Sequence, residues 1–228
     1  RQMCIRDRGG LVAFPTETVY GLGGNGLNKE ASKKIYAAKG RPSDNPLILH
    51  IADMEQFYPL IKTDNAKIIA RAEALADVFW PGPLTMILPK ADNIPYETTG
   101  GLDTVAIRMP SHLVARALLQ ECKMPIAAPS ANLSGRPSPT SASHVIEDMN
   151  GRIEMIIDGG DVGIGVESTI IDLTGEVPML LRPGFVTPEM LQQVLGTVET
   201  DAAVYRQVGK DVHLSLIHIS EPTRPISI

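Results

Sequence analysis

Short apolar segments that stop at proline, glycine or polar residues recur along this chain, and they outnumber its amphipathic segments. Segments of this length, bounded by turn-forming residues, are typical of strands. We therefore expect strands at residues 11–14, 46–51, 84–88, 104–109, 125–128, 155–158, 168–173 and 179–182. Alternation within a strand places Ile48 and His50 on one face, and it places Arg108 opposite Val105 and Ile107.

Helical spacing of apolar residues predicts fewer helices. One follows Asn28, a suitable N-cap, and ends at Gly40. Others are expected at residues 64–79, at 141–149, from Ser111 as the cap through Gln120, and from Thr187-Pro188 to Gly196. Residues 16–24 and 129–139 read as loops.

Strands and helices do not alternate strictly. This favours an α+β fold with a twisted mixed parallel and antiparallel sheet flanked by helices, and it argues against a doubly wound parallel sheet. With 43% hydrophobic residues in 228, the chain can form one domain, which we place at residues 9–200. Residues 201–212 are expected to begin a linker. Residues 1–8 and 213–228 resemble translated sequencing-adapter read-through and are expected to be non-native ends, the alternative being ordinary disordered tails.

Composition excludes several functions. A net charge of -5 disfavours sequence-blind nucleic-acid binding. Cys4 and Cys122 form no CxxC motif, so structural zinc is not expected. No apolar run approaches the roughly 18 residues of a membrane span, and no signal peptide is visible. These features predict a cytoplasmic protein without a membrane partner.

The usual phosphate-binding motifs are missing. The sequence has no GxxxxGK[ST] loop, and the glycines at 21, 23 and 24 are too few and too misplaced for a dinucleotide loop. It also has no HExxH metal motif and no GxSxG nucleophile motif. If the chain binds phosphate, it must do so by other residues.

Basic side chains at the ends of predicted elements offer that alternative. They are Lys39 and Arg41 at a helix C-terminus, Arg108 in an apolar strand, and Arg182 at a strand end. Any one of them is more often a solvated surface group, but an unpaired charge within an apolar strand is costly. Site residues commonly lie in loops at element ends.

Hydroxyl groups recur in loops framed by proline and glycine. They are Thr16, Thr18, Ser130, Ser138, Ser168 and Thr169. Turn formation alone could explain any one of them. Together with the cations they suggest a pocket for a polyanion and a small polar ligand. The residues by themselves lead no further than an anion-binding α/β enzyme.

Seven motifs in order resemble the YrdC-like family of threonylcarbamoyl-AMP synthases. They are FPTETVYGLG at 14–23, KGRPSDNPLILHI at 39–51, WPGPLT at 80–85, GLDTVAIRMP at 101–110, PIAAPSAN at 125–132, GVESTIID at 165–172 and LRPG at 181–184. The resemblance covers about residues 9–200. It implies the YrdC-like (DHBP synthase-like) fold.

The resemblance also implies site residues. Threonine would be held by Thr18, His50, Arg108, Ala128 and Ser168. ATP would be held by Lys39, Arg41, Asn45, Thr104, Ser130, Asn132, Ser138 and Arg182, with Lys39 and Arg41 as the catalytic cations. No residue of the chain is expected to bind a metal directly, because Mg²⁺ would be carried by the ATP phosphates.

The implied reaction joins L-threonine, bicarbonate or CO₂ and ATP into L-threonylcarbamoyladenylate, with release of pyrophosphate. The product would serve N6-threonylcarbamoyladenosine formation in tRNA, through a tRNA threonylcarbamoyl transferase complex and with weak or indirect tRNA contact. Relatives carry a strand and a helix before the position of residue 9 and continue past residue 200, so we expect a truncated long form.

Other functions stay open at this point. An RNA-binding module without catalysis is the main alternative, and it would lose affinity steeply with salt. A carbamoyl-transferring enzyme of the hydrogenase-maturation kind should carry zinc-finger cysteines, which the chain lacks. A sugar-phosphate lyase of similar fold should carry acidic metal ligands, which are not found in the motifs.

Overall fold

The computed structural model describes residues 9–207 of the chain. The strands are β1 Val12–Pro15, β2 Tyr20–Asn25, β3 Ile48–His50, β4 Leu84–Pro89, β5 Thr104–Arg108, β6 Ile126–Ala127, β7 Met155–Ile156, β8 Thr169–Asp172, β9 Met179–Arg182 and β10 Glu199–Thr200. The helices are α2 Lys29–Lys39, α3 Met54–Phe57, the 3-10 helix η1 Tyr58–Leu60, α4 Ala66–Phe79, α5 Tyr96–Thr99, α6 Leu113–Cys122, α7 Ala142–Met149, α8 Pro188–Leu195 and α9 Ala202–Gln207.

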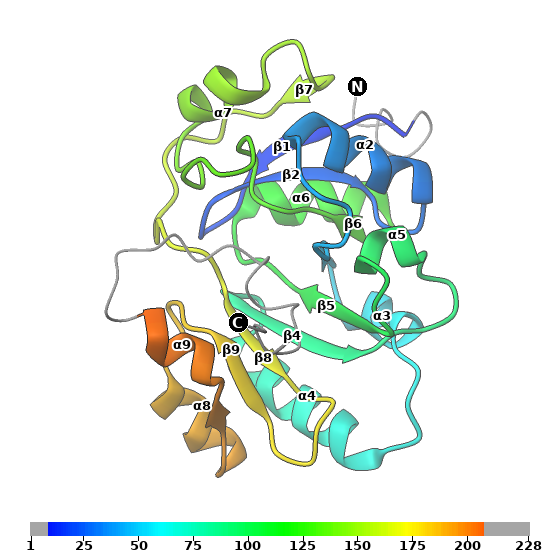
Figure 1. Ribbon diagram of the computed structural model, residues 1–228, viewed down its shortest axis with the longest axis vertical. Coiled ribbons are helices and arrows are strands. Elements are labelled where there is room, and N and C mark those ends of the chain that lie inside the picture. Colours follow the sequence, from blue (N-terminus) through cyan, green and yellow to red (C-terminus); the bar gives the residue numbers. More distant parts are fainter. Residues whose placement is uncertain (1–8, 208–228) are drawn as a thin grey trace, which may run out of the picture.

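All of these strands join one mixed sheet in the order β10-β9-β8-β4-β5-β3-β6-β2-β1-β7. The sheet combines parallel pairs such as β3–β5 and β4–β8 with antiparallel pairs such as β4–β5 and β1–β2. Helices α2 and α6 pack near β1 and β2, while α4 and α8 lie at the other end of the sheet (Figure 1). The expected mixed sheet flanked by helices is confirmed.

The middle strands present two different faces. Residues that pair across strands share a face, so His50 and Thr85 both flank Arg108. Val105 and Ile107 point the other way, into the main hydrophobic core. The predicted division of the 104–109 strand into an apolar and a polar side is therefore confirmed.

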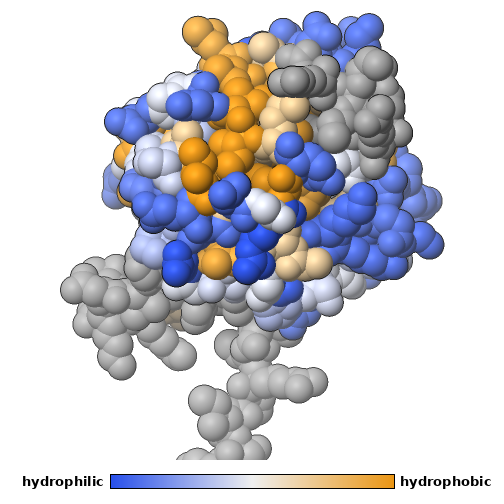
Figure 2. All heavy atoms as spheres, turned by 90° about the horizontal axis from the view of Figure 1, so that it is seen from above, coloured by the Kyte–Doolittle hydropathy of each residue, from blue (hydrophilic) through white to orange (hydrophobic). Residues whose placement is uncertain are grey.

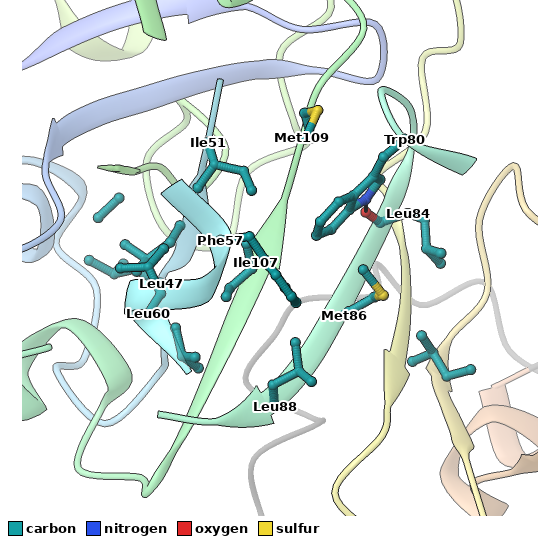
Figure 3. Close-up of a cluster of buried hydrophobic side chains, with 14 of the residues drawn as sticks. Leu47, Ile51, Phe57, Leu60, Trp80, Leu84, Met86, Leu88, Ile107 and Met109 are labelled. Atoms are coloured by element: carbon teal, nitrogen blue, oxygen red, sulfur yellow. Dashed lines mark hydrogen bonds between the residues drawn. The ribbon is translucent and has the colours of Figure 1, made fainter. Parts of the chain in front are cut away.

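The core fills the space between the apolar sheet face and the helices. Figure 3 shows Phe57 and Trp80 packed with the aliphatic side chains around β4 and β5. Trp80 also donates its indole N–H to the carbonyl of Leu84 at 2.7 Å, so its polar atom is satisfied. This packing covers the apolar face of β4 and β5. The opposite face, which carries Arg108, does not take part in this packing and is available for a site.

The capping of α2 is confirmed. The side chain of Asn28 accepts hydrogen bonds from the N–H groups of Glu30 and Ala31, and Gly40 adopts a left-handed conformation with φ 61°. The sharp turn at Gly40 places Lys39 at the end of the helix and directs the following segment toward the sheet.

The expected loop at residues 16–24 is wrong in its second half, because β2 occupies Tyr20–Asn25. The glycines that resembled a turn instead allow close strand packing. A Cβ at Gly23 would lie 2.7 Å from Cε1 of Phe14. Strand β2 therefore needs glycine at a position where the sequence pattern predicts a loop.

The start of α6 also differs from the prediction. His112, and not Ser111, is the N-cap, with Nδ1 accepting from the N–H of Val114 at 3.2 Å. The N–H of Ser111 donates instead to Glu17. The helix continues to Cys122, beyond Gln120.

Some strands are shorter than the sequence predicted, and some short helices and strands were not predicted at all. Strands β3, β6 and β7 are shorter than the apolar runs that predicted them. The short helices α3, η1 and α5 and the edge strand β10 were missed. Helix α9 lies in the segment expected to begin a linker, while the predicted non-native ends at 1–8 and 213–228 lie outside the described residues.

Seen from the end that carries α7 and β7, hydrophobic side chains gather in a strip bordered by hydrophilic ones (Figure 2). Within residues 9–207, no helix combines the length and the apolar character needed to cross a membrane.

Candidate active site

A cavity of about 780 Å³ lies over the polar face of the middle strands. Its walls come from the segments around Thr18, Lys39, Ser130, Glu167 and Arg182, which are far apart in the sequence. Of the predicted site residues, the cavity gathers Thr18, Lys39, Arg41, Asn45, His50, Arg108, Ala128, Ser130, Asn132, Ser138, Ser168 and Arg182. Thr104 is the exception: it begins β5, pairs with Pro89 and does not line the cavity.

Lys39 ties helix α2 to the loop after β6. Its Nζ donates to the carbonyl of Asn132 at 2.5 Å and to the side-chain oxygen of Asn132 at 3.3 Å, and also to the carbonyl of Ser130. Burial lowers the pKa of Lys39 to about 7. Near neutral pH, Lys39 is therefore protonated in only part of the molecules.

Arg41 and Asn45 leave buried polar atoms without partners. Arg41 donates from Nη2 to the carbonyl of Pro46 at 3.3 Å, but its Nε has no hydrogen bond. Burial lowers the pKa of Arg41 to about 10, so it stays charged. Asn45 is 1% exposed, and both atoms of its amide are unpartnered. Unsatisfied groups of this kind are costly, so a water molecule or a polar ligand is expected to satisfy them.

Arg182 is fixed at the end of β9. Its Nε donates to the carbonyl of Ser168 at 3.0 Å and its Nη2 to the hydroxyl of Ser168 at 3.1 Å. Its Nη1 pairs with Glu167. Burial lowers the pKa of Arg182, and the nearby carboxylate of Glu167 opposes that shift.

Arg108 is fixed at the end of β5. Its Nη1 donates to the hydroxyl of Thr18 at 2.9 Å, and its Nη2 lies 2.6 Å from the carboxylate of Glu17. Burial raises the pKa of Glu17, but the charge and hydrogen bond of Arg108 outweigh this, and the pKa is lowered overall. Glu17 therefore stays ionised and orients the guanidinium.

His50 is a buried neutral imidazole. Burial lowers its pKa to about 3. Its Nδ1 lies 3.2 Å from the carbonyl of Ile48, which can only accept a hydrogen bond, so Nδ1 carries the proton. The other ring nitrogen, Nε2, is then an acceptor for a ligand donor.

The loop at 129–139, confirmed as a loop, is held by helix α7. Asp148 accepts from the N–H of Leu133 at 3.0 Å and from Nη1 of Arg136 at 2.5 Å. Asn132 donates to the carbonyls of Leu133 and Arg136. This network fixes the carbonyl groups that accept hydrogen bonds from Lys39.

Sequence reasoning missed three carboxylates that organise the site. Glu17 and Glu167 are in the motifs PTET and GVEST, each directly beside a predicted site hydroxyl. Arg108 within an apolar strand calls for an acidic partner, and that requirement could have identified Glu17. Arg182 is expected at a strand end, a position that carries no such requirement, so Glu167 had no comparable signal. The sequence around Asp148 contains no motif that could have identified its role.

The arrangement suits an anionic ligand next to a small polar one. Lys39, Arg41 and Arg182 can neutralise a polyanion, while Arg108, Thr18 and His50 form a second set of donors and acceptors. Across residues 9–207, no group of three or more His, Cys, Asp or Glu side chains could hold a metal ion.

Similarity to known proteins agrees with this geometry. The chain is 58% identical to threonylcarbamoyl-AMP synthase of Pyrococcus abyssi over 91% of its length and 59% of that protein. It is 52% identical to threonylcarbamoyl-AMP synthase of Bacillus subtilis over 96% of its length and 62% of that protein. It therefore spans about three fifths of the length of these curated relatives.

Solved structures extend the similarity. The crystal structure of P. abyssi Sua5 complexed with L-threonine matches with a TM-score of 0.86 and 56% identity, covering 94% of this chain and 61% of that one. Escherichia coli YciO matches with a TM-score of 0.71 and 26% identity, covering 82% and 89%. The family model described as "Telomere recombination", that of Sua5, YciO and YrdC, matches residues 4–184. This chain belongs to the Sua5/YciO/YrdC family.

Proposed function

We propose that this chain synthesises L-threonylcarbamoyladenylate from L-threonine, bicarbonate or CO₂ and ATP, and releases pyrophosphate. Relatives named threonylcarbamoyl-AMP synthase at 58% and 52% identity support the proposal, as does the relative solved with L-threonine. The observation that carries it is that four basic side chains from different segments, at positions 39, 41, 108 and 182, line one cavity.

Threonine is assigned to the part of the cavity around Arg108. The guanidinium pairs with the threonine carboxylate, and the hydroxyl of Ser168 contacts the same group. Thr18 and the imidazole of His50 supply polar partners for the threonine hydroxyl and amine. Ala128 contributes backbone contacts.

ATP is assigned to the part lined by Lys39, Arg41 and Arg182. These cations neutralise the phosphates, and the hydroxyls of Ser130 and Ser138 add hydrogen bonds. The unpartnered amide of Asn45 and Nε of Arg41 gain partners when the nucleotide binds. Asn132 acts on the phosphate site through Lys39.

The chemistry needs alignment more than a protein nucleophile. The threonine nitrogen attacks CO₂ to give a carbamate with loss of a proton. A carbamate oxygen then forms a bond to the α-phosphorus of ATP, the bond to the bridging oxygen breaks, and pyrophosphate leaves with that electron pair. Lys39, Arg41 and Arg182 stabilise the charge on the transferred and leaving phosphates.

Mg²⁺ is expected to arrive on the ATP phosphates and to supply further charge neutralisation there. The donor set agrees with this, because the cavity offers the isolated carboxylate of Glu167 and no acidic cluster. Mg²⁺ readily keeps water and phosphate oxygens as ligands and needs few protein carboxylates.

The product is proposed to pass to a tRNA threonylcarbamoyl transferase complex in the cytoplasm, with weak or indirect tRNA contact. The net charge of -5 and the burial of Lys39, Arg108 and Arg182 favour small anions over extended RNA. The RNA-binding alternative therefore has less support.

The test is to incubate the purified chain with ATP, labelled bicarbonate and single amino acids. Label should enter an adenylate and pyrophosphate should be released only when threonine is present. Lys39→Met should abolish both, whereas Lys33→Met, at an exposed position on the same helix, should not. Pyrophosphate release that does not depend on threonine would contradict the proposal.

A further inference from the structure

Glu167 lies inside the cavity among groups that are expected to bind phosphate. Its Oε1 accepts from the hydroxyl of Ser138 at 2.7 Å, and its Oε2 pairs with Nη1 of Arg182. The Glu167 side chain is 24% exposed, compared with 3% for Arg182. Both residues line the cavity, and the carboxylate is the more exposed partner of the pair.

The charge of Glu167 reaches the other two cations of the phosphate site. Burial lowers the pKa of Lys39 and of Arg41, and in both cases the negative charge of Glu167 opposes that shift. Asp148 also opposes the shift at Lys39, and Tyr36 and Asp44 also oppose it at Arg41. Glu167 is the carboxylate that acts on all three cations, Lys39, Arg41 and Arg182.

Glu17 provides an informative contrast. It pairs with Arg108, but it is also held by the N–H of Ser111 and does not line the cavity. Glu167 faces the cavity, and among the described residues its oxygens are held by side chains, without a backbone N–H. Release of Glu167 would therefore break only contacts between side chains, whereas release of Glu17 would also break a hydrogen bond to the backbone.

We propose that Glu167 is a positioning residue that acts as an exchangeable internal counterion. In the empty site it holds Arg182 and Ser138 in place, and it yields both groups to phosphate oxygens when ATP binds. Carboxylate and phosphate oxygens are equivalent acceptors for arginine and hydroxyl donors, so one can replace the other. The exchange lowers the affinity for ATP and assists the release of pyrophosphate. This inference rests on the proposed binding of ATP in the cavity.

Glu167→Gln tests the exchange in the full chain. The amide keeps the size of the side chain but removes the competing charge, so calorimetry should show ATP and inorganic pyrophosphate binding roughly tenfold more tightly. Affinity for L-threonine should change much less. Glu121→Gln removes the same charge from an exposed position on α6 and should leave all three affinities within about twofold.

A purely structural role for Glu167 would weaken ATP binding in the variant, so unchanged or weaker binding with normal threonine affinity overturns the inference. If wild type binds neither ATP nor pyrophosphate, the proposed function itself fails at its nucleotide site.

A second measurement does not depend on the folding of any variant. In a crystal structure of the wild-type chain with inorganic pyrophosphate, Arg182 and Ser138 should contact phosphate oxygens and Glu167 should have left both. A Glu167 side chain that keeps both partners beside bound pyrophosphate overturns the exchange.

Discussion

Burial lowers the pKa values of Lys39, Arg41 and Arg182 in the cavity and so decides which of them stay charged. Lys39 is almost fully buried and has a pKa of about 7, while Arg41 keeps its charge with a pKa of about 10. Arginine retains its proton when desolvated far better than lysine does. The site therefore combines permanent positive charges with one that depends on pH and ligand.

Arg108→Ala should impair threonine use much more than ATP binding. It removes the proposed carboxylate partner and leaves Glu17 as a buried unpaired charge. We expect the KM for threonine to rise at least about tenfold, with ATP affinity nearly unchanged. Steady-state kinetics and calorimetry can separate the two, with Arg108→Lys as the control that keeps the charge. Equal losses for both ligands would show that Arg108 is wrongly assigned.

The pKa of Lys39 predicts pH-dependent binding of ATP. Phosphates stabilise the ammonium, so the pKa rises on binding and a proton is taken up wherever free Lys39 is neutral. ATP affinity should therefore fall as pH rises above about 7. Calorimetry in buffers with different ionisation enthalpies measures the uptake, and Lys39→Arg should suppress it. Affinity that rises with pH over this range would be inconsistent with the assignment.

At the scale of elements, the site depends on the close approach of two segments. Gly184, after β9, packs against the segment before β8: a Cβ there would lie 2.7 Å from the carbonyl of Glu167 and 2.7 Å from the N–H of Thr169. Both contacts are backbone atoms and cannot move aside easily. This approach places Arg182 beside Glu167 and Ser168.

Gly184→Ala should therefore separate β9 from β8 at the cavity. We expect a loss of roughly 1–3 kcal/mol in the free energy of unfolding, together with weaker ATP binding. Denaturant unfolding and calorimetry measure these. Gly163→Ala is the matched control, since a Cβ at Gly163 meets nothing within 4 Å. Identical behaviour of the two variants would remove the structural role given to Gly184.

Elements with strong local signals could be predicted from the sequence. The caps of α2, the apolar stripe of α4 and the strand at β5 follow from periodicity and capping residues. Strand β2 could not be predicted, because the need for glycine at position 23 comes from Phe14 on the neighbouring strand. Register and pairing are tertiary properties that a single segment does not contain.

The site residues also divide into those that a local motif predicts and those that depend on tertiary contacts. The motifs identified hydroxyls and cations that line the cavity, but Glu17 and Glu167 act through partners about ninety and fifteen residues away. The nucleotide role of Thr104 stays a prediction, and its position at the far end of β5 from Arg108 does not support it.

At the scale of the whole molecule, an acidic chain concentrates positive charge inside one cavity. The net charge is -5, yet the cations at 39, 108 and 182 are each 2–3% exposed. Buried charges act on ligands that enter the cavity, and they contribute little to attraction at the outer surface.

The polar groups of the cavity also predict selectivity among amino acids. Valine lacks the hydroxyl and would leave polar site groups unpaired, which is a strong filter, whereas serine lacks one methyl group, worth roughly 10–200-fold. Serine should therefore be a weak substrate and valine a much poorer one, as measured by kcat/KM for pyrophosphate release. Serine used as efficiently as threonine would contradict this pocket.

The central claim is that one cavity holds ATP and threonine side by side. A crystal structure of the chain with a non-hydrolysable ATP analogue and L-threonine tests it most directly. We expect the threonine carboxylate on Arg108, the phosphates on Lys39, Arg41 and Arg182, and the threonine nitrogen facing the α-phosphorus. Ligands bound on separate surfaces, or mutually exclusive in the cavity, would contradict it.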